Sequence, residues 1–291
     1  MPTIDPDISS KQVEAVGAML AESFLGHMFP HEDAADLVCR RIMQFPNGLP
    51  DDDFNYPWGL VIPSPPNMPG AFAVSTSIDF FPRDHLTADP QAVPPSPPFV
   101  ISDFKVPALG TTQVIPQLLW IPYKDTKRKL EPVMAPVFFV ATDRTVGIPL
   151  LTATTAQSNP KILLNPDHCP FGDKSTLKVV TWFLGYKRKE YKTEEGKPGA
   201  KVNLRQTDGP HASLSRILQS VAVHLKTRIE DMQRNHKSHL DETCPLDSAR
   251  PGHQWWSDRG GLIGVSLEAI VLVGLVAVSP GAVMPILEVR G

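Results

Sequence analysis

The chain has 291 residues, of which 42% are hydrophobic and 20% are charged, so it carries enough apolar side chains for a folded core. Its net charge of −3 argues against the strongly basic face of a dedicated nucleic-acid-binding protein. The chain has three cysteines, Cys39, Cys169 and Cys244. Such a small and uneven number does not indicate a disulfide framework. The polar N-terminus lacks the apolar segment of a secretory signal, so we expect a cytoplasmic location and no nucleic-acid partner.

Residues 1–45 are expected to form an N-terminal helical segment that precedes a core domain over 46–291. Two apolar stripes at helical spacing predict a pair of helices: Val13, Val16, Leu20 and Phe24, then Ala34, Leu37, Val38, Ile42 and Phe45. Gly26 and Pro30 are expected to end the first helix, because glycine and proline disfavour a helix interior.

Proline dominates the next part of the chain, where 18 of the 31 prolines lie between Pro46 and Pro136. Because each proline removes a backbone donor, no long helix can cross this stretch. Apolar runs between polar breaks predict strands at 58–62, 71–81, 99–106, 113–123, 133–142, 146–154 and 177–186. Asp143-Arg144 is expected to turn a hairpin, and residues 89–98 (DPQAVPPSPP) are expected to form a proline-rich loop.

A charged loop is expected at 187–209, and it leads into the clearest amphipathic pattern of the chain. Apolar residues at helical spacing predict a helix at 211–235: Leu214, Ile217, Leu218, Val221, Leu225, Ile229 and Met232. Either Asp208 or Ser213 can cap its first turn. Residues 236–260 are polar, and we expect them to be irregular.

The apolar C-terminus has two interpretations, a membrane tail over residues 261–287 or the buried end of a sheet. The uncharged run Ala269–Leu287 approaches the roughly 20 residues that a spanning helix needs. Pro280-Gly281 interrupts it with residues typical of a turn, and β-branched residues precede them. We therefore favour a β-hairpin, with strands at Ile270–Val278 and Val283–Val289, and no membrane partner.

These elements predict an α+β fold: a mainly antiparallel sheet, an N-terminal helix pair, and the helix at 211–235 packed on the sheet. The run Val180–Tyr186, the amphipathic helix, Trp255-Trp256, Gly260–Ile263 and the final hairpin follow one another in this order. This pattern, over residues 177–291, resembles uncharacterised open reading frames of mushroom-forming fungi. The resemblance implies no activity, but it implies that the last apolar run is sheet.

The spacing His236-x-x-His239-x-x-x-x-Cys244 is the cluster most similar to a metal site, because imidazole and thiolate are good zinc ligands. Asp167-His168-Cys169 could add further ligands. The alternative is a polar helix end that runs into a loop, and we favour it because structural zinc normally needs four ligands at defined spacing. We therefore expect no metal and no cofactor.

Catalytic signatures are weak. Cys169 could be a nucleophile with a distant base such as His85 or His211, yet neither a serine-hydrolase elbow nor a phosphate-binding glycine motif is present. Asp51-Asp52-Asp53 could hold a hard cation, although such runs are usually solvated loops. The stretch EAVGAMLAESF is similar to the first helix of GNAT-type acyltransferases, but the pyrophosphate-binding loop of that family is missing.

The basic residues between Lys187 and Arg205 alternate with Tyr186 and Tyr191, as in some nucleic-acid-binding segments, but glutamates partly cancel their charge. We therefore expect a non-catalytic, intracellular binding or scaffold protein that acts through protein–protein contacts with an unknown partner. The proline-rich loop 89–98 and exposed edge strands are the expected contact surfaces. Two alternatives stay open: an enzyme of unrecognised family, with acyl transfer as the first guess, and a tail-anchored membrane protein.

Overall fold

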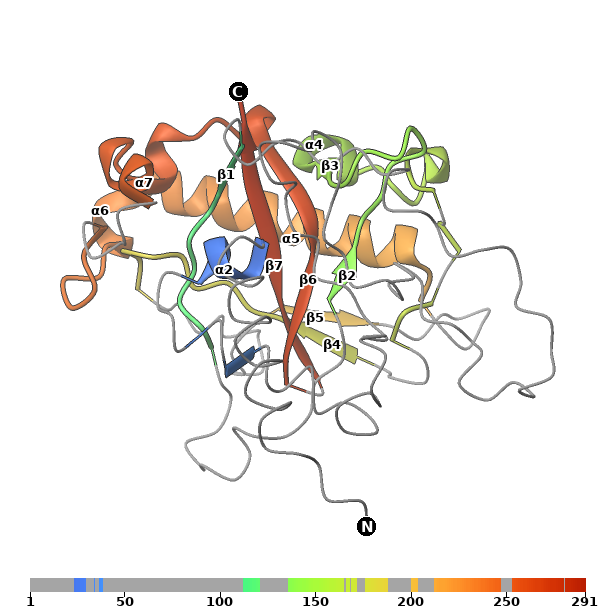
Figure 1. Ribbon diagram of the computed structural model, residues 1–291, viewed down its shortest axis with the longest axis horizontal. Coiled ribbons are helices and arrows are strands. Elements are labelled where there is room, and N and C mark those ends of the chain that lie inside the picture. The colour runs from blue at the N-terminus through green and yellow to red at the C-terminus, as the bar shows by residue number, and fades with distance from the viewer. Residues whose placement is uncertain are drawn as a thin grey trace, which may run out of the picture.

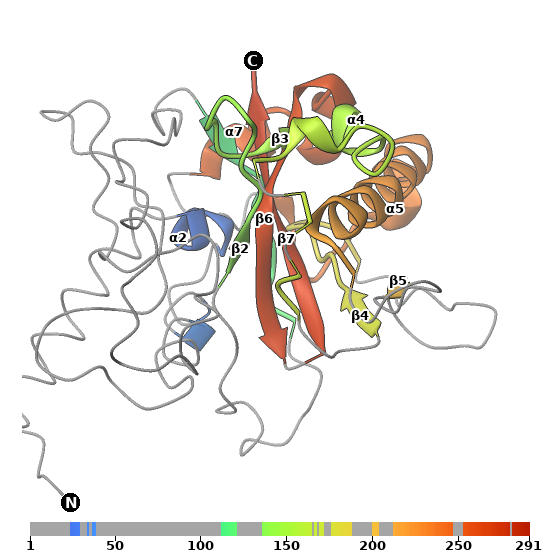
Figure 2. The ribbon, with the colours of Figure 1, turned by 90° about the vertical axis from the view of Figure 1, so that its right-hand side faces the viewer.

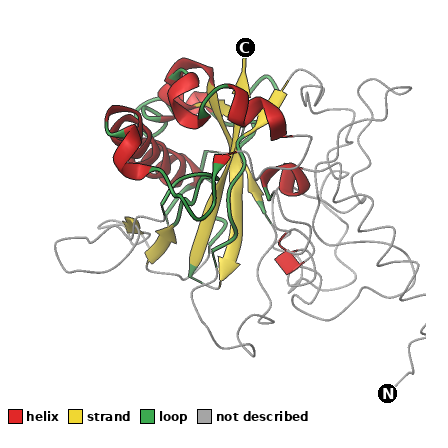
Figure 3. Ribbon diagram, turned by 90° about the vertical axis from the view of Figure 1, so that its left-hand side faces the viewer, coloured by secondary structure: helices red, strands yellow, loops and turns green. Residues whose placement is uncertain are grey.

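The computed structural model describes residues 24–29, 34, 37–38, 112–120, 136–164, 166–167, 169–171, 176–187, 200–203, 212–246, 253–279 and 281–291. These residues form a seven-stranded sheet and several helices, which confirms the predicted α+β fold with a mainly antiparallel sheet (Figure 1). Helix α5 (Leu214–Arg234) lies on one side of the two longest strands, and helix α2 (Phe24–Met28) lies on the other (Figures 2 and 3).

A long hairpin forms the centre of the sheet. Strand β6 (Ile270–Ser279) and strand β7 (Ala282–Arg290) pair in antiparallel register, and all ten residues of β6 are buried. Gly281 lies in the turn between them, whereas Pro280 lies outside the described residues. Strands that are buried on both faces read as continuous apolar runs, which explains why this segment also resembles a membrane helix in composition. The predicted hairpin is confirmed.

Five short strands complete the described sheet. They are β1 (Thr112–Val114), β2 (Val137–Phe138), β3 (Ile148–Pro149), β4 (Thr176–Val179) and β5 (Ala200–Asn203). The order is β2-β6-β7-β4-β5, while β1 also pairs with β7 and β3 also pairs with β6. Among the described pairs, β4–β7 is parallel and the other five are antiparallel. The sheet is therefore built around β6 and β7.

One edge of β7 is shared by β1 and β4, which approach from opposite ends. Ile115 N–H donates to the carbonyl of Leu287, and Val180 N–H donates to that of Val283. Between these two bonds lies Pro285, whose carbonyl accepts a bond of 2.6 Å from Nε2 of the buried Gln117 side chain. Because proline has no N–H to offer a neighbouring strand, it fits at the position where both partners leave the ladder.

The opposite edge, on β6, is covered by β2 and β3 in succession. The chain leaves the β6 edge after Phe139 and returns to it at Ile148. The residues between them reverse direction at Asp143-Arg144, as predicted. Arg144 adopts a left-handed backbone with φ of 67°, and the Asp143 carboxylate accepts the N–H of Thr145 at 2.9 Å. Such side-chain bonds to nearby backbone are typical of tight turns.

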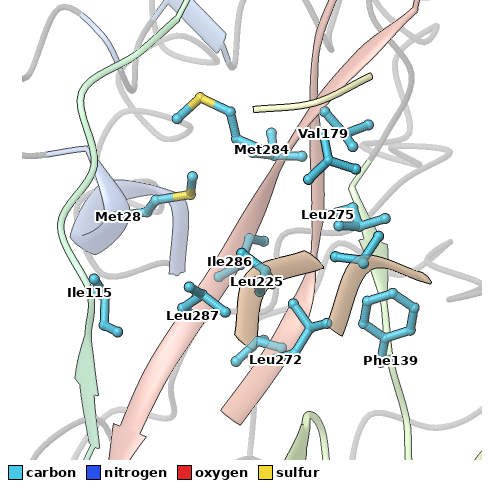
Figure 4. Close-up of a cluster of buried hydrophobic side chains, with 14 of the residues drawn as sticks. Met28, Ile115, Phe139, Val179, Leu225, Leu272, Leu275, Met284, Ile286 and Leu287 are labelled. Carbon is cyan, nitrogen blue, oxygen red and sulfur yellow. The ribbon is translucent and has the colours of Figure 1, made fainter. Parts of the chain in front are cut away.

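Helix α5 (Leu214–Arg234) confirms the helix predicted at 211–235, and its N-cap is Ser213 rather than Asp208. The Ser213 hydroxyl accepts the N–H of Arg216 at 3.4 Å. All seven apolar residues that predicted the helix are buried. Figure 4 shows Leu225 of α5 among buried side chains of the central hairpin, including Leu272 and Ile286.

The N-terminal helix pair is described only in part. Helix α2 (Phe24–Met28) and the helical residues Ala34, Leu37 and Val38 fall where the pair was expected. Gly26 does not end the first helix, since α2 continues through it to Met28. The cost of about 1 kcal/mol for a helical glycine is small beside the burial of Met28 and Phe29.

Several short elements differ from prediction. The run 146–154 begins as β3 but continues as helix α4 (Leu150–Ala153), because a continuous apolar run fits a buried helix as well as a strand. The expected loop 187–209 contains β5, which pairs with β4. The expected irregular stretch 236–260 contains two short helices, α6 (His236–His239) and α7 (Gln254–Asp258). The strands expected between residues 58 and 106 lie outside the described residues, as does the loop 89–98.

The C-terminal apolar segment forms two 3₁₀ turns and the hairpin, not a continuous helix. Within the part of the chain that the structure describes, no helix is both long and apolar enough to cross a membrane.

Gly274 provides a test of how closely β2 approaches β6. A Cβ atom at this position would lie 2.6 Å from the carbonyl oxygen of Val137, whereas a Cβ at Gly281 would meet nothing within 4 Å. We expect Gly274→Ala to cost about 1–3 kcal/mol of unfolding free energy, as overpacking usually does, and Gly281→Ala to have little effect. Denaturant titration of both variants measures this, and equal small effects would show that β2 is not held against Gly274.

Leu218 tests the packing of α5. This side chain is fully buried, whereas Val223 on the same helix is 47% exposed. Leu218→Ala is expected to cost about 2–5 kcal/mol, and Val223→Ala less than about 0.5 kcal/mol, in thermal or denaturant unfolding. Val223 is a cleaner control than the neighbouring Gln219, whose Oε1 accepts the N–H of Gln157. Similar losses from both variants would contradict the observed orientation of the helix.

Candidate functional site

Polar side chains gather where α5 ends and α6 (His236–His239) begins. Asn235 has φ of −110° and ψ of 30°, which interrupts the helix between the two elements. The backbone at 185–187 lies beside this junction: Lys187 N–H donates to the carbonyl of His239, and Asp241 N–H donates to that of Gly185. We call Arg228, Asp231, His236, His239 and Tyr186 the α5–α6 polar cluster.

Asp231 holds one half of this cluster together. Its Oδ2 lies 3.3 Å from Nε2 of His239 and 3.7 Å from Nη1 of Arg228, and both partners are only 2% exposed. Its Oδ1 accepts a bond of 2.9 Å from Nδ2 of Asn235. A carboxylate that orients a histidine is also found in catalytic triads. Here the histidine is buried, so the interaction fastens α6 to the end of α5 and leaves little access for a substrate.

Tyr186 and His236 form the other half. The Tyr186 hydroxyl lies 3.1 Å from Nδ1 of His236, and the rings meet edge to face with centroids 5.5 Å apart. The same hydroxyl accepts the N–H of Leu262 at 2.8 Å. Burial raises the pKa of Tyr186 to about 12, so the phenol stays protonated near neutral pH. This tyrosine therefore acts as a hydrogen-bonding brace.

The structure separates the three candidate metal ligands. His236 bonds to Tyr186 and His239 faces Asp231, while Cys244 packs against the hydrophobic core. Among the described residues, no group of three or more histidine, cysteine, aspartate or glutamate side chains is arranged to hold a metal ion. Of the second candidate group, Asp167 and Cys169 are described and His168 lies outside the described residues.

Cys169 is poorly suited to be a nucleophile. Its Sγ lies 3.4 Å from the carbonyl oxygen of Asp167 and donates to it. Burial, together with the charge of Asp167, raises the pKa of the Cys169 thiol. Because the thiolate is the reactive form, this environment lowers reactivity. Neither of the expected bases, His85 and His211, lies within the described residues, and the acidic run 51–53 lies outside them as well.

Other polar side chains brace the fold, and few of them could be predicted from sequence patterns. Nε1 of Trp256 donates to the carbonyl of Leu184 at 3.1 Å, and Nε2 of Gln233 donates to the carbonyls of Leu262 and Val265. Nε2 of His253 bonds to the carbonyl of His27, which links the C-terminal segment to α2. Buried tyrosine and tryptophan generally need such a partner, which is the one hint that sequence reasoning could have used.

Comparisons with protein-family models, with curated proteins and with solved structures find no significant match to this chain.

His224 predicts how stability depends on pH. Burial, together with the charge of Arg228, lowers its pKa to about 4, whereas an unfolded histidine has a pKa near 6.5. Between these values the unfolded state binds the proton and the folded state does not, so stability falls as the pH drops from about 6.5 to about 4. The full loss is on the order of 3 kcal/mol.

Denaturant unfolding of the wild type and of His224→Gln over this pH range measures the effect. The variant should show a flatter dependence of unfolding free energy on pH, by about 2–3 kcal/mol over the interval. Parallel pH profiles for the two proteins would mean that His224 titrates normally in the folded state.

Proposed function

We propose that this chain is a non-catalytic, intracellular binding or scaffold protein that acts through contact with a protein partner. The two described cysteines, Cys169 and Cys244, are free thiols, as is usual in a reducing compartment. The side chains with catalytic chemistry in the α5–α6 polar cluster are engaged in internal bonds that hold helices and turns together. The free thiols support an intracellular location. The internal bonds support a structural use of side chains that an enzyme would expose to its substrate.

The observation that carries the proposal is an exposed surface on α7 (Gln254–Asp258) and the following turn. The Arg259 guanidinium lies 5.7 Å from the centroid of the half-buried Trp255 ring, and Ile263 is 51% exposed. A Cβ on Gly260 would lie 3.5 Å from the Ile263 side chain, so the turn and this side chain are close together. We call Trp255, Arg259 and Ile263 the α7 surface. Tryptophan and arginine are enriched in the residues that dominate binding energy at protein interfaces.

The α7 surface is held firmly from beneath. Trp256, next to Trp255, is fully buried and bonded to Leu184, and Gln233 bonds to the carbonyls of Leu262 and Val265, one on each side of Ile263–Gly264. A surface that is ordered before binding loses less conformational entropy when a partner docks. These contacts support a role in recognition.

Site-specific photo-crosslinking tests the proposal. A photoreactive amino acid is placed at Ile263 or, as the matched control, at Val223, which is 47% exposed on α5. Crosslinking in cells of the source organism is expected to give a discrete protein adduct from position 263 but not from position 223. The adduct should be lost when Trp255→Ala and Arg259→Ala are introduced together.

The partner recovered in this way is then purified, and its Kd is measured. Ile263→Asp should weaken binding by at least about tenfold, equal to about 1.4 kcal/mol, while Val223→Asp leaves it unchanged. Equal adducts from both positions, or a Kd that is indifferent to Ile263→Asp, would refute a specific contact through the α7 surface.

A further inference from the structure

The bond between Tyr186 and His236 closes a latch over the turn that follows α7. Tyr186 is fully buried, and Nδ1 of His236 lies 3.1 Å from its hydroxyl. Gly260 and Gly261 have φ of 69° and 73°, and this left-handed turn directs the backbone N–H of Leu262 at the same hydroxyl. A Cβ on Gly261 would lie 2.7 Å from the hydroxyl oxygen, so the approach requires glycine.

The donors and acceptors around the Tyr186 hydroxyl determine the direction of its two hydrogen bonds. A phenol has one O–H donor and two acceptor lone pairs. The N–H of Leu262 can only donate, so it takes one lone pair of the oxygen, and among the described residues Nδ1 of His236 is the group placed to accept the hydroxyl proton. A buried hydroxyl needs such an acceptor, so Nδ1 of His236 accepts and the neutral ring carries its proton on Nε2. A protonated ring carries a proton on Nδ1 as well and cannot accept, so the Tyr186 O–H would lose its acceptor.

We propose that protonation of His236 opens this latch and uncovers the apolar side chains that lie beneath residues 253–265. His236 is itself partly exposed, so solvent protons reach it while Tyr186 stays buried. Protonation of His236 removes the acceptor for the Tyr186 proton, and an unpaired buried hydroxyl costs about 1–3 kcal/mol. The phenol then leaves its site, and the turn loses the bond to Leu262 N–H.

The charged groups around His236 do not compensate for protonation. On α5, the carboxylate of Asp231 is engaged by Arg228 and His239. Beside α6, Lys187 acts on the carboxylate of Asp241. Burial lowers the pKa of His236. The neutral, bonded ring is therefore the form that the fold selects.

Trp256 reports on the state of the latch. Its ring meets Tyr186 edge to face at 6.4 Å, its Nε1 donates to the Leu184 carbonyl, and it is fully buried. Departure of Tyr186 exposes this indole to water, which shifts its emission to longer wavelength. The measurements need only the isolated chain, so their outcome does not depend on the proposed partner.

The test compares the wild type, His236→Gln and Lys237→Gln as the pH is lowered through the usual histidine range, from about 7.5 to about 4.5. Lys237 is exposed on the same short helix, so its change removes a cation without touching the latch. In the wild type and in Lys237→Gln, hydrogen-exchange protection of the Leu262 amide, corrected for intrinsic rates, should fall at least tenfold, and the Trp256 emission should shift to the red. A Trp256→Phe version of each protein identifies that emission.

In His236→Gln, protection of the Leu262 amide should fall only as far as the loss of global stability through His224 requires, and loss of protection at the wild-type midpoint would overturn the proposal. If this variant does not fold, NMR titration of the wild type decides. The His236 Cε1–H and the Leu262 amide should titrate with one midpoint, and separate midpoints would overturn the latch.

Discussion

The fold depends on burying the β6–β7 hairpin on both faces and along both edges. A two-stranded hairpin is marginal by itself in water, because its backbone groups and apolar side chains remain exposed. Here the ten residues of β6 and eight of the nine in β7 are buried, so cover must come from elsewhere in the chain. The other described elements supply it: short strands line both edges, α5 covers one face and α2 the other (Figure 2).

Covering the edges with short strands creates gaps, and single polar residues fill them. Gln117 reaches across the gap between β1 and β4 to the carbonyl of Pro285, a residue with no N–H to leave unpaired. At the far end of β7, the fully buried Glu288 pairs with Arg290 at 2.6 Å, and Arg290 also donates to the carbonyl of Val146. Removing one member of such a buried pair leaves a desolvated charge, so these residues are more constrained than their polar type suggests.

The sequence was informative where a pattern is long and local. The α5 stripe and the β-branched run of the hairpin each extend over enough residues for periodicity or composition to identify them. The N-cap of α5 stayed open between Asp208 and Ser213 until the structure placed Ser213 there. Short elements were missed because four residues such as His236–His239 carry no period, and Leu150 continues an apolar run that fits strand and helix alike. The contact between Tyr186 and His236 was missed for another reason. Tyr186 and His236 are 50 residues apart, and only tertiary folding brings them together.

Several polar side chains in the described part of the molecule bond to backbone groups inside the protein. Tyr186, Gln233 and Trp256 place their polar atoms on backbone groups of the segments that carry the α7 surface and support it. An aromatic or cationic side chain binds a partner most effectively when its backbone is already ordered, since less entropy is lost on docking. If the chain binds a partner as we propose, these internal hydrogen bonds would supply rigidity, and Trp255, Arg259 and Ile263 would supply contact area. A change to Tyr186, Gln233 or Trp256 would then alter recognition without removing any side chain that touches the partner.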